Sequence, residues 1–469
     1  MKVTEFNERK KFSESSGVTA YADDGLSMRL NEFGIYEEVV IQEGKSEISP
    51  MVSYISPIFN TETNESIIAH KLFSQHNGIQ FDERVGYYLS LYAGHVTEGD
   101  YREHGSSGGM GTWILTELFN RKMIDAVIHV KMNSDPNDQV LFRYDISRSV
   151  DEIRAGAKTK YYPVEMSQVL KLVKENPGRY AIIGIPSFIM SIRLLAEKDD
   201  VIRERIKYTV GLICGHQKSS KFSEALAWQV GIKPGNLEHI DFRKKMTEGP
   251  ANQYGVEFVG YINGKITTII KPKHELLGQD WGQGFFKQMA SDFTDDVFNE
   301  TADIALGDAW MPEYNADHQG NNIIAVRNPE IDKLVKVGRE TGKLILDEVD
   351  IQTIFLSQSS HYKHTHDELS YRLYKKDILG EWRPKKRVAP SKRISLLRRR
   401  VQDLREEISM QSHILYKEAV EMDNLNHFIR NMNILSKKYK GIYKLLVIHN
   451  KGLKGIAQAI GRRIFSKIK

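Results

Sequence analysis

A glycine-rich loop stands directly before a segment with the period of an amphipathic helix. The loop runs Gly105-Ser106-Ser107-Gly108-Gly109-Met110-Gly111, and the helix is expected over 112–122. A helix N-terminus presents unpaired N–H groups and a partial positive charge, and glycines let a phosphate approach the backbone closely. The loop matches neither the dinucleotide fingerprint nor the Walker pattern. The sequence therefore predicts a phosphate-binding loop, with a tight turn as the alternative.

Further candidate residues follow two apolar segments that are expected to be buried strands. Pro186 and Ser187 come after the segment 180–185, and Cys214 and His216 come after the segment 208–213. Ligands of open α/β sheets gather beyond the carboxyl ends of the strands, so these residues are expected close to one another. A lone buried cysteine is more often a small apolar side chain than a nucleophile.

Three histidines, His361, His364 and His366, lie beside Asp367 and Glu368. Imidazoles at helical spacing can bind zinc, but the segment has no fixed ligand set, and a solvated helix start is the preferred interpretation. The sequence also contains no serine-hydrolase elbow, kinase motif set or zinc-protease helix. We predict no metal site.

The elements that must position these residues alternate between strand and helix. Strands are expected over 87–93, 126–132, 180–185, 208–213 and 302–308, and helices over 112–122, 165–176, 189–197 and 223–230. This rhythm predicts an α/β fold with a helix-covered, mainly parallel sheet. Two more strands, 257–262 and 265–270, flank Asn263-Gly264, which is a strong signal for an antiparallel hairpin.

The charge is divided unevenly along the 469 residues. Residues 381–469 carry 22 basic and 7 acidic side chains, whereas the other 380 residues carry 44 basic and 54 acidic ones. The single cysteine excludes intrachain disulfides and fits a reducing cytoplasm. No run of 18 apolar residues occurs, and the first 16 residues lack the apolar stretch of a secretory signal. We therefore expect a cytoplasmic protein with an acidic body and a basic tail.

The basic tail begins with a proline-punctuated linker, 381–393. Apolar residues from Leu397 to Met432 then recur at spacings that sum to sevens, which predicts a long helix with a short coiled coil and, through it, a homodimer. Residues 437–469 hold ten basic and no acidic side chains, with Leu453, Ile456, Ile460, Ile464 and Ile468 on one helical face. Such a helix favours an anionic membrane surface. A partner protein ranks second, and nucleic acid is not expected because no aromatic stacking platform is present.

Several motifs, in order, resemble those of the coenzyme F-420 (deazaflavin) hydrogenase/dehydrogenase β-subunit family. The resemblance begins with residues 86–130, which contain the Ser-Gly-Gly loop. It continues with Lys158-Thr159-Lys160-Tyr161, Ile183-Gly-Ile-Pro186-Ser187, Val210-Gly-Leu-Ile-Cys214 and the segment 301–310, which holds Asp303, Gly307 and Asp308. Together the motifs cover about residues 85–380.

The resemblance implies an FAD-binding protein that moves electrons between the flavin, iron–sulfur clusters and a second carrier. Typical members hold a cluster through four cysteines, and the corresponding positions here are Ser187, Cys214, Ser291 and Thr294. Residues 1–80 resemble a degenerate ferredoxin-like segment with Ser56 in place of a cysteine. One thiolate cannot hold a cubane cluster. We therefore expect FAD without an iron–sulfur cluster, with a reduced deazaflavin or a nicotinamide as hydride donor.

The resemblance also implies a set of cofactor-binding residues, namely Gly105, Ser106, Ser107, Gly108, Gly109, Lys158, Thr159, Lys160, Tyr161, Pro186, Ser187, Asp303, Gly307 and Asp308. The expected domains are a degenerate ferredoxin-like segment (1–80), a flavin domain (81–380), the basic linker (381–393) and a helical basic tail (394–469). The predicted function is a flavin-dependent oxidoreductase at the inner face of the membrane.

Its expected substrate is an intermediate of surface-polysaccharide assembly, with the enzymes of that synthesis as partners, because members of the family include proteins associated with bacterial exopolysaccharide synthesis. The alternative is a non-catalytic scaffold that dimerises and docks a membrane or a glycosyltransferase. A transferase that uses the phosphate loop for a nucleotide-sugar is a third hypothesis.

Overall fold

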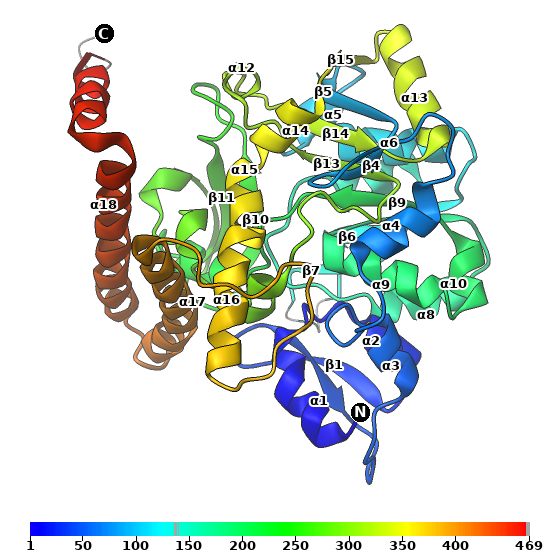
Figure 1. The fold of residues 1–469 in the computed structure, drawn as a ribbon, viewed down its shortest axis with the longest axis horizontal. Coiled ribbons are helices and arrows are strands. Elements are labelled where there is room, and N and C mark those ends of the chain that lie inside the picture. Colours follow the sequence, from blue (N-terminus) through cyan, green and yellow to red (C-terminus); the bar gives the residue numbers. More distant parts are fainter. Residues whose placement is uncertain (136–137, 139, 466–469) are drawn as a thin grey trace.

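The computed structural model describes the backbone of residues 1–135, 138 and 140–465 and the side chains as far as residue 449. An eight-stranded sheet lies at its centre (Figure 1). The strand order is β15 (Leu344–Glu348), β5 (Ser90–Val96), β14 (Asn322–Val326), β13 (Ile304–Asp308), β9 (Ile206–Leu212), β8 (Tyr180–Gly184), β6 (Ala126–Met132) and β7 (Phe142–Ser147). The neighbours β13, β9, β8 and β6 are parallel, and antiparallel strands complete both edges. The predicted α/β fold is confirmed.

Both faces of this sheet are covered by helices because successive side chains of its strands point to opposite faces. Val127 and Ala181 pack with helices α6 (Met110–Asn120) and α13 (Pro329–Glu340). Ile128 and Ile182 pack with helices α8 (Ser167–Glu175) and α9 (Pro186–Ala196) on the other face. Such two-sided burial explains why these strands are apolar runs without alternation.

The carboxyl ends of five strands meet at one edge of the sheet. β13, β9, β8 and β6 are parallel, and β5 has the same direction as β13 because both pair antiparallel with β14. The glycine-rich loop follows β5, Pro186 follows β8 and Cys214 follows β9. The topology therefore brings most of the sequence-predicted site residues to one edge.

A smaller antiparallel sheet consists of β10 (Leu237–Lys244), β11 (Gly255–Ile262) and β12 (Lys265–Pro272). Ile262 pairs with Lys265 across Asn263 and Gly264, which both have positive φ, as a two-residue hairpin turn requires. The predicted hairpin is present in the structure.

The N-terminal segment contains α1 (Val3–Arg9), α2 (Val18–Ala22), the hairpin β1 (Leu26–Leu30) and β2 (Tyr36–Val40), α3 (Pro50–Ile55) and α4 (Glu65–Phe73). The short hairpin β3 (Gln80–Asp82) and β4 (Gly86–Tyr88) leads into the sheet. Its ferredoxin-like character, like the other domain boundaries, stays a prediction.

The tail forms two antiparallel helices, α17 (Leu396–Glu421) and α18 (Leu425–Phe465), which lie together along one side of the molecule (Figure 1). The expected single helix is interrupted because Asp423 adopts the left-handed conformation, with φ 45°. Val401, Ile408 and Met432 of the apolar stripe are buried in a core shared with α11 (Lys221–Trp228) and the smaller sheet. The stripe is therefore covered within the chain, which removes the basis for a coiled-coil dimer.

The isoleucine stripe of 453–468 lies outside the residues whose side chains are described. No helix in the described part of the chain is long and apolar enough to cross a membrane.

Residues 381–393, predicted as a linker, run along the body and are called the strap below. Trp382 packs edge-on against Phe12, with ring centroids 5.3 Å apart. The strap follows α14 (Ile351–Ser357), α15 (Ser359–Thr365) and α16 (Asp367–Ile378). The histidine cluster lies in and after α15, and the solvated helix start predicted there is wrong for His364, which is buried against α16 and α17.

Candidate functional site

The glycine-rich loop is held tightly by the rest of the chain. Ser106 Oγ accepts a hydrogen bond from the Thr159 N–H at 2.8 Å, and the Ser107 hydroxyl donates to the Asn321 carbonyl at 2.7 Å. A methyl group at Gly108 would come within 2.6 Å of Asn322 Oδ1 and 2.7 Å of the Gly94 carbonyl. Glycine at this position therefore accommodates a close approach of the protein's own backbone.

Asn322 lies between the loop and strand β13. Its Oδ1 accepts the Met110 N–H at the start of α6 (3.3 Å), and its Nδ2 donates to the Gly307 carbonyl (3.1 Å). One amide side chain thus satisfies one of the free N–H groups at the helix N-terminus that was predicted to face a phosphate. Binding of a ligand by Gly105–Gly109 stays a prediction.

The segment Lys158–Tyr161 lies beside the loop, as the resemblance implies. Lys158 forms an ion pair with Asp241 at 3.1 Å. The Lys160 ammonium donates to the carbonyls of Gly156, Ala157 and Lys158 at the end of α7 (Val150–Ala155). Burial lowers the pKa of Lys160 to about 7. The ring of Tyr161 packs edge-on against Trp281, with centroids 4.6 Å apart.

Three residues that sequence reasoning missed complete a cation cluster, defined here as Arg102, Lys158, Lys160, Arg243 and Lys245. Lys245 Nζ donates to the carbonyls of Arg102 and Ser107, the latter at 2.9 Å. Arg243 pairs with Asp308 at 2.5 Å, which places this predicted site residue in the cluster. A shallow hollow lined by Ser106, Lys245, Tyr254 and His318 opens next to these groups.

The cluster has more cations than carboxylates. Three of the five cations have a carboxylate partner: Lys158 pairs with Asp241, Arg243 with Asp308 and Arg102 with Asp317. The ammonium groups of Lys245 and Lys160 donate to backbone carbonyls instead. Burial lowers the pKa of Lys245 to about 7, and the charges of Lys158, Arg102 and Arg243 act in the same direction. An anion placed in the hollow would relieve this repulsion.

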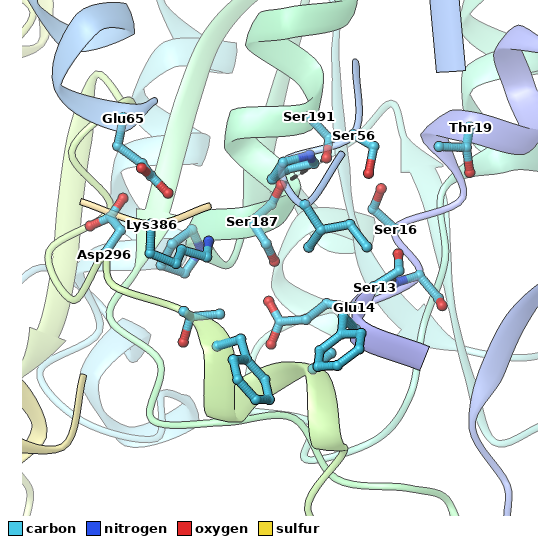
Figure 2. A pocket seen from close by; sticks show the side chains of 18 of the residues that line it. Ser13, Glu14, Ser16, Thr19, Ser56, Glu65, Ser187, Ser191, Asp296 and Lys386 are labelled. Atoms are coloured by element: carbon cyan, nitrogen blue, oxygen red, sulfur yellow. Dashed lines mark hydrogen bonds between the residues drawn. The ribbon is translucent and has the colours of Figure 1, made fainter. Parts of the chain in front are cut away.

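A second polar region at the same edge is a cavity between the N-terminal segment, the start of α9 and the strap (Figure 2). It offers about 30 Å³ to the centres of water-sized molecules, roughly enough for two waters. Its hydroxyl groups are those of Ser13, Ser15, Ser16, Thr19, Ser56, Ser187, Ser191 and Thr294. We call it the hydroxyl cavity.

The hydroxyl cavity brings together the positions that the resemblance assigns to lost cysteines. Ser56, Ser187 and Thr294 line it directly. Ser291 donates to Glu14 at 2.6 Å, and Glu14 also lines the cavity. Burial raises the pKa of the Cys214 thiol to about 12, and the charge of Glu14 acts in the same direction, which places Cys214 near the cavity. These positions come from four segments of the chain, and no local pattern could have placed them together.

Charged groups surround the same cavity. Figure 2 shows Glu14, Ser187 and Lys386 directed toward a common space, with Glu65 facing Asp296 beside it. Glu38 accepts hydrogen bonds from Ser13, Ser15 and Thr19, and burial raises its pKa. Burial, followed by the charges of Glu300 and Glu65, raises the pKa of Asp296 well above its usual range.

The strap supplies cations to this acidic region. Arg387 donates to both carboxylate oxygens of Glu300 at 2.9 Å and, through its backbone N–H, to Asp295 at 2.8 Å. Lys386 approaches Asp295 to 3.7 Å. The described residues contain no group of three or more histidine, cysteine, aspartate or glutamate side chains that could hold a metal ion.

Asp303 is the predicted site residue that lies away from both regions. It precedes β13, whereas Asp308 ends that strand, so the two occupy opposite edges of the sheet. Asp303 accepts the Thr209 N–H at 2.7 Å and pairs with Arg193 at 3.0 Å, and it is buried. These contacts join α9 to β9 and β13.

Two family models match the chain, and both describe the β subunit of coenzyme F420 hydrogenase/dehydrogenase. Residues 91–171 match the N-terminal model of that subunit, and residues 178–352 match its C-terminal model. A chain of the xenon-derivatised F420-reducing [NiFe] hydrogenase complex from Methanosarcina barkeri is similar at 13% identity, with a TM-score of 0.48. The similarity covers 64% of this chain and 97% of that one. No curated protein matches the sequence.

These matches correct the cofactor prediction. The coenzyme in both family descriptions is F420, and members of this family usually carry iron–sulfur clusters together with FAD. The expectation of FAD without an iron–sulfur cluster, and of a nicotinamide as the donor, therefore does not follow from the family and is withdrawn, whereas the deazaflavin is the coenzyme that both family descriptions name.

The residues of this chain fit an anionic coenzyme better than they fit an iron–sulfur cluster. The positions assigned to cluster ligands carry serine and threonine hydroxyls and one thiol, which are not the thiolate set that iron–sulfur clusters take. The cation cluster beside its hollow does fit an anionic group, because Lys245 lacks a carboxylate partner within the described residues. The two matched ranges together span more than half of the 469 residues, and the chain belongs to the coenzyme F420 hydrogenase/dehydrogenase β-subunit family, an oxidoreductase-type family.

Proposed function

We propose that this protein is an oxidoreductase subunit that binds coenzyme F420 at the carboxyl edge of the central sheet, with the anionic part of the coenzyme over the cation cluster. The observation that carries the proposal is the convergence of Arg102, Lys158 and Arg243 on Lys245, which lines a hollow together with one carboxylate, that of Glu248. Three separate segments of the chain supply these groups, and the family description supplies the coenzyme.

Within this proposal each residue has a definite task. Lys245 and Arg102 hold negative charge above the Ser106–Ser107 backbone, and Lys158 adds charge from the opposite side. Lys160 caps helix α7 and keeps the 156–161 segment in place. Tyr254, whose ring lies 4.9 Å from the Arg243 guanidinium, offers an apolar wall to the hollow. The bound coenzyme would supply or accept a hydride.

A fluorescence titration of the purified full-length protein with F420 tests the proposal. We expect saturable binding that the Lys245→Met substitution weakens at least about tenfold, because one charge-assisted contact in a partly buried site contributes roughly 1.5–3 kcal/mol. Lys265→Met is the matched control, since Lys265 is an exposed lysine of the β11–β12 turn. Absence of binding to the unsubstituted protein would contradict the proposal, as would equal affinities for all three proteins.

We further propose that helix α18 holds the protein at an anionic membrane surface, where it acts on an intermediate of surface-polysaccharide assembly. Ile434, Leu445 and Ile448 of α18 are exposed beside Lys437, Lys438 and Lys444, and no acidic residue follows Leu425. The polysaccharide role is supported by the motif resemblance alone. Co-sedimentation with phosphatidylglycerol vesicles, compared with neutral vesicles, tests the membrane contact.

The scaffold hypothesis has one observation in its favour. Asn322 Oδ1 accepts the Met110 N–H at the start of helix α6 and approaches Gly108 closely, so the chain itself supplies one acceptor that a phosphate would otherwise provide. A protein that binds vesicles but not F420 would support the scaffold over the oxidoreductase subunit.

A further inference from the structure

A group of buried cations lies away from the cation cluster, between the body and the C-terminal helices. Its members are Lys218, Lys287, Arg372 and Arg405, whose residues are 1%, 1%, 8% and 7% exposed. Lys218 and Lys287 are joined by a backbone bridge in the body, whereas Arg372 belongs to α16 and Arg405 to α17. We call them the buried cation group.

The carboxylates near this group are fewer than its cations. Lys287 forms an ion pair with Asp292, which Arg372 also approaches to 3.7 Å. Glu368 lies 3.6 Å from Arg405 and also pairs with Arg398. Within 4.0 Å, two carboxylates therefore serve three of the four cations.

Lys218 has no carboxylate within 4.0 Å among the described residues. Its ammonium donates to the Phe285 carbonyl at 2.5 Å and lies 4.4 Å from the centre of the Trp281 ring and 4.8 Å from that of Phe222. Burial, followed by the charges of Lys287 and Arg405, lowers the pKa of Lys218 well below its usual range, and the attraction of Asp280 opposes this from a greater distance. Lys218 is thus a buried ammonium group that has no direct ionic partner and that its surroundings push toward the neutral amine.

Several nitrogens around the group also lack hydrogen-bond partners within the described part of the chain. They are Nε2 of His216, His361 and His364 and Nε of Arg405, all of which are shielded from solvent. His364 Nδ1 accepts from the guanidinium groups of Arg372 (3.2 Å) and Arg405 (3.1 Å), so this network assigns its hydrogen to Nε2. Of these nitrogens, His364 Nε2, which lies 3.8 Å from Asp292, and Arg405 Nε are donors without a hydrogen-bond acceptor in a region where cations outnumber carboxylates.

Such an arrangement is costly for a protein alone. A buried polar group without a partner costs roughly 1–3 kcal/mol, and a buried charge without a partner costs more. Native structures contain few such groups, and an ion or water normally explains them. A bound anion would supply both the missing hydrogen-bond acceptors and the missing negative charge.

We propose that the buried cation group binds a small inorganic anion, chloride or an oxyanion of the phosphate class, which joins the body to helices α15, α16 and α17. This site goes beyond the proposed coenzyme function, because it shares no residue with the cation cluster. The histidines and arginines of α15–α17 come from residues 361–405, beyond the family match that ends at residue 352. The anion is a structural ligand of this chain.

Thermal unfolding of the full-length protein at fixed ionic strength tests the site. Gluconate is replaced stepwise by chloride, sulfate or phosphate, each up to about 20 mM, where general salt effects on stability are small. We expect one of these anions to raise Tm by about 2–5 °C with a saturable dependence, as mass action requires for a ligand that binds the folded state.

The Lys218→Met variant should lose this dependence and be no less stable than the unsubstituted protein in gluconate, because it removes an unmatched buried charge. Lys271→Met, which affects an exposed lysine paired with Glu275, should keep the full response. If Lys218→Met does not fold, His361→Phe provides the second variant, with the same expected loss of response.

The identity of the anion that raises Tm indicates the size of the site. A response to chloride indicates a site for a monatomic ion, and a response to sulfate or phosphate indicates a site for an oxyanion. A Tm that is independent of all three anions overturns the proposal. An equal response in Lys218→Met and in the unsubstituted protein overturns it as well.

Discussion

The cation cluster and the hydroxyl cavity occupy the same edge of one sheet and have opposite charge. In the cation cluster, Lys245 is surrounded by Lys158, Arg102 and Arg243, which lower its pKa in addition to the effect of burial. In the hydroxyl cavity, Asp296 lies near Glu300 and Glu65, whose charges raise its pKa in addition to the effect of burial. Each region therefore contains a group that burial and its like-charged neighbours push toward the neutral form.

The difference lies in where the opposite charge comes from. The strap brings Lys386 and Arg387 into the acidic region, so the chain itself neutralises the hydroxyl cavity. Among the described residues, Lys245 forms no ion pair within 4.0 Å, although Asp317 attracts it from a greater distance and Glu248 lines the same hollow. The acidic region beside the cavity thus has its countercharges within the chain, whereas Lys245 has only carbonyl partners, which is the feature on which the proposed binding of an anionic coenzyme rests.

The largest expected effect is that of Arg387→Met. The substitution removes the guanidinium that binds both carboxylate oxygens of buried Glu300 and that lies 3.7 Å from the Asp295 carboxylate, while the backbone N–H of residue 387 still donates to Asp295. Arg327 nearby already donates to five backbone carbonyls and does not replace it. We expect a loss of about 3–5 kcal/mol in the free energy of unfolding, measured with urea.

Arg383→Met on the same strap is the control, because Arg383 pairs with the exposed carboxylate of Asp377 and should cost less than about 1 kcal/mol. Equal losses for the two variants would show that Arg387 does not neutralise a buried charge.

Two neighbouring aspartates of the acidic region, Asp295 and Asp296, have pKa values shifted in opposite directions. Burial opposes ionisation of Asp295, but Lys386 and Arg387 hold its pKa below the usual value, whereas the pKa of Asp296 is raised. Asp295→Asn should therefore cost about 2–3 kcal/mol at pH 7, because it removes a paired charge.

Asp296→Asn should change the free energy of unfolding by less than about 1 kcal/mol, because an amide replaces a carboxyl group that is already neutral. Urea unfolding of both variants checks the difference. A greater loss in Asp296→Asn than in Asp295→Asn would reverse the assignment of the charged partner.

The smallest expected effect is that of Lys245→Met, at less than about 1 kcal/mol at pH 7, because the lost hydrogen bonds are offset by relief of repulsion. The folded-state pKa of Lys245 is about 7 and its unfolded value 10.5, so the unfolded chain binds more protons between these pH values. Stability of the unsubstituted protein should therefore rise from pH 7 toward pH 10.

The variant should show a smaller rise, with the remainder supplied by the other buried lysines whose pKa is lowered, namely Lys160 (about 7), Lys287 (about 8) and Lys218. Urea midpoints measured at pH 7, 8, 9 and 10 give this slope. Identical slopes for variant and unsubstituted protein would place Lys245 outside the repulsive cluster.

Much of the fold could be predicted from the sequence because its signals are local. Strand β6 has the bounds expected from its apolar run, and the β11–β12 turn follows from Asn263-Gly264. The break between α17 and α18 could not be predicted in the same way. Asp423 is a residue that adopts the left-handed conformation at a modest cost, and the heptad spacing continued across it.

The site was less predictable because its partners are distant in the chain. The glycine loop and Lys158–Tyr161 were found from motifs, and Ser106 does contact Thr159. Lys245 reaches the loop from 138 positions away, and Asn322 from 212 positions away, without any pattern that marks them. Arg387 was assigned to a linker, since a proline-punctuated run of basic residues carries no sign of the buried carboxylates that it meets.

The strap has a consequence for the order in which the protein is made. Asp295 and Arg387 are 92 positions apart, so at about 5–20 residues per second the arginine leaves the ribosome roughly 5–18 s after the aspartate. During that interval the carboxyl groups of Glu65, Asp295, Asp296 and Glu300 have no strap beside them and stay solvated or protonated. The sheet edge around the hydroxyl cavity can therefore close only late in synthesis, once the strap has been made.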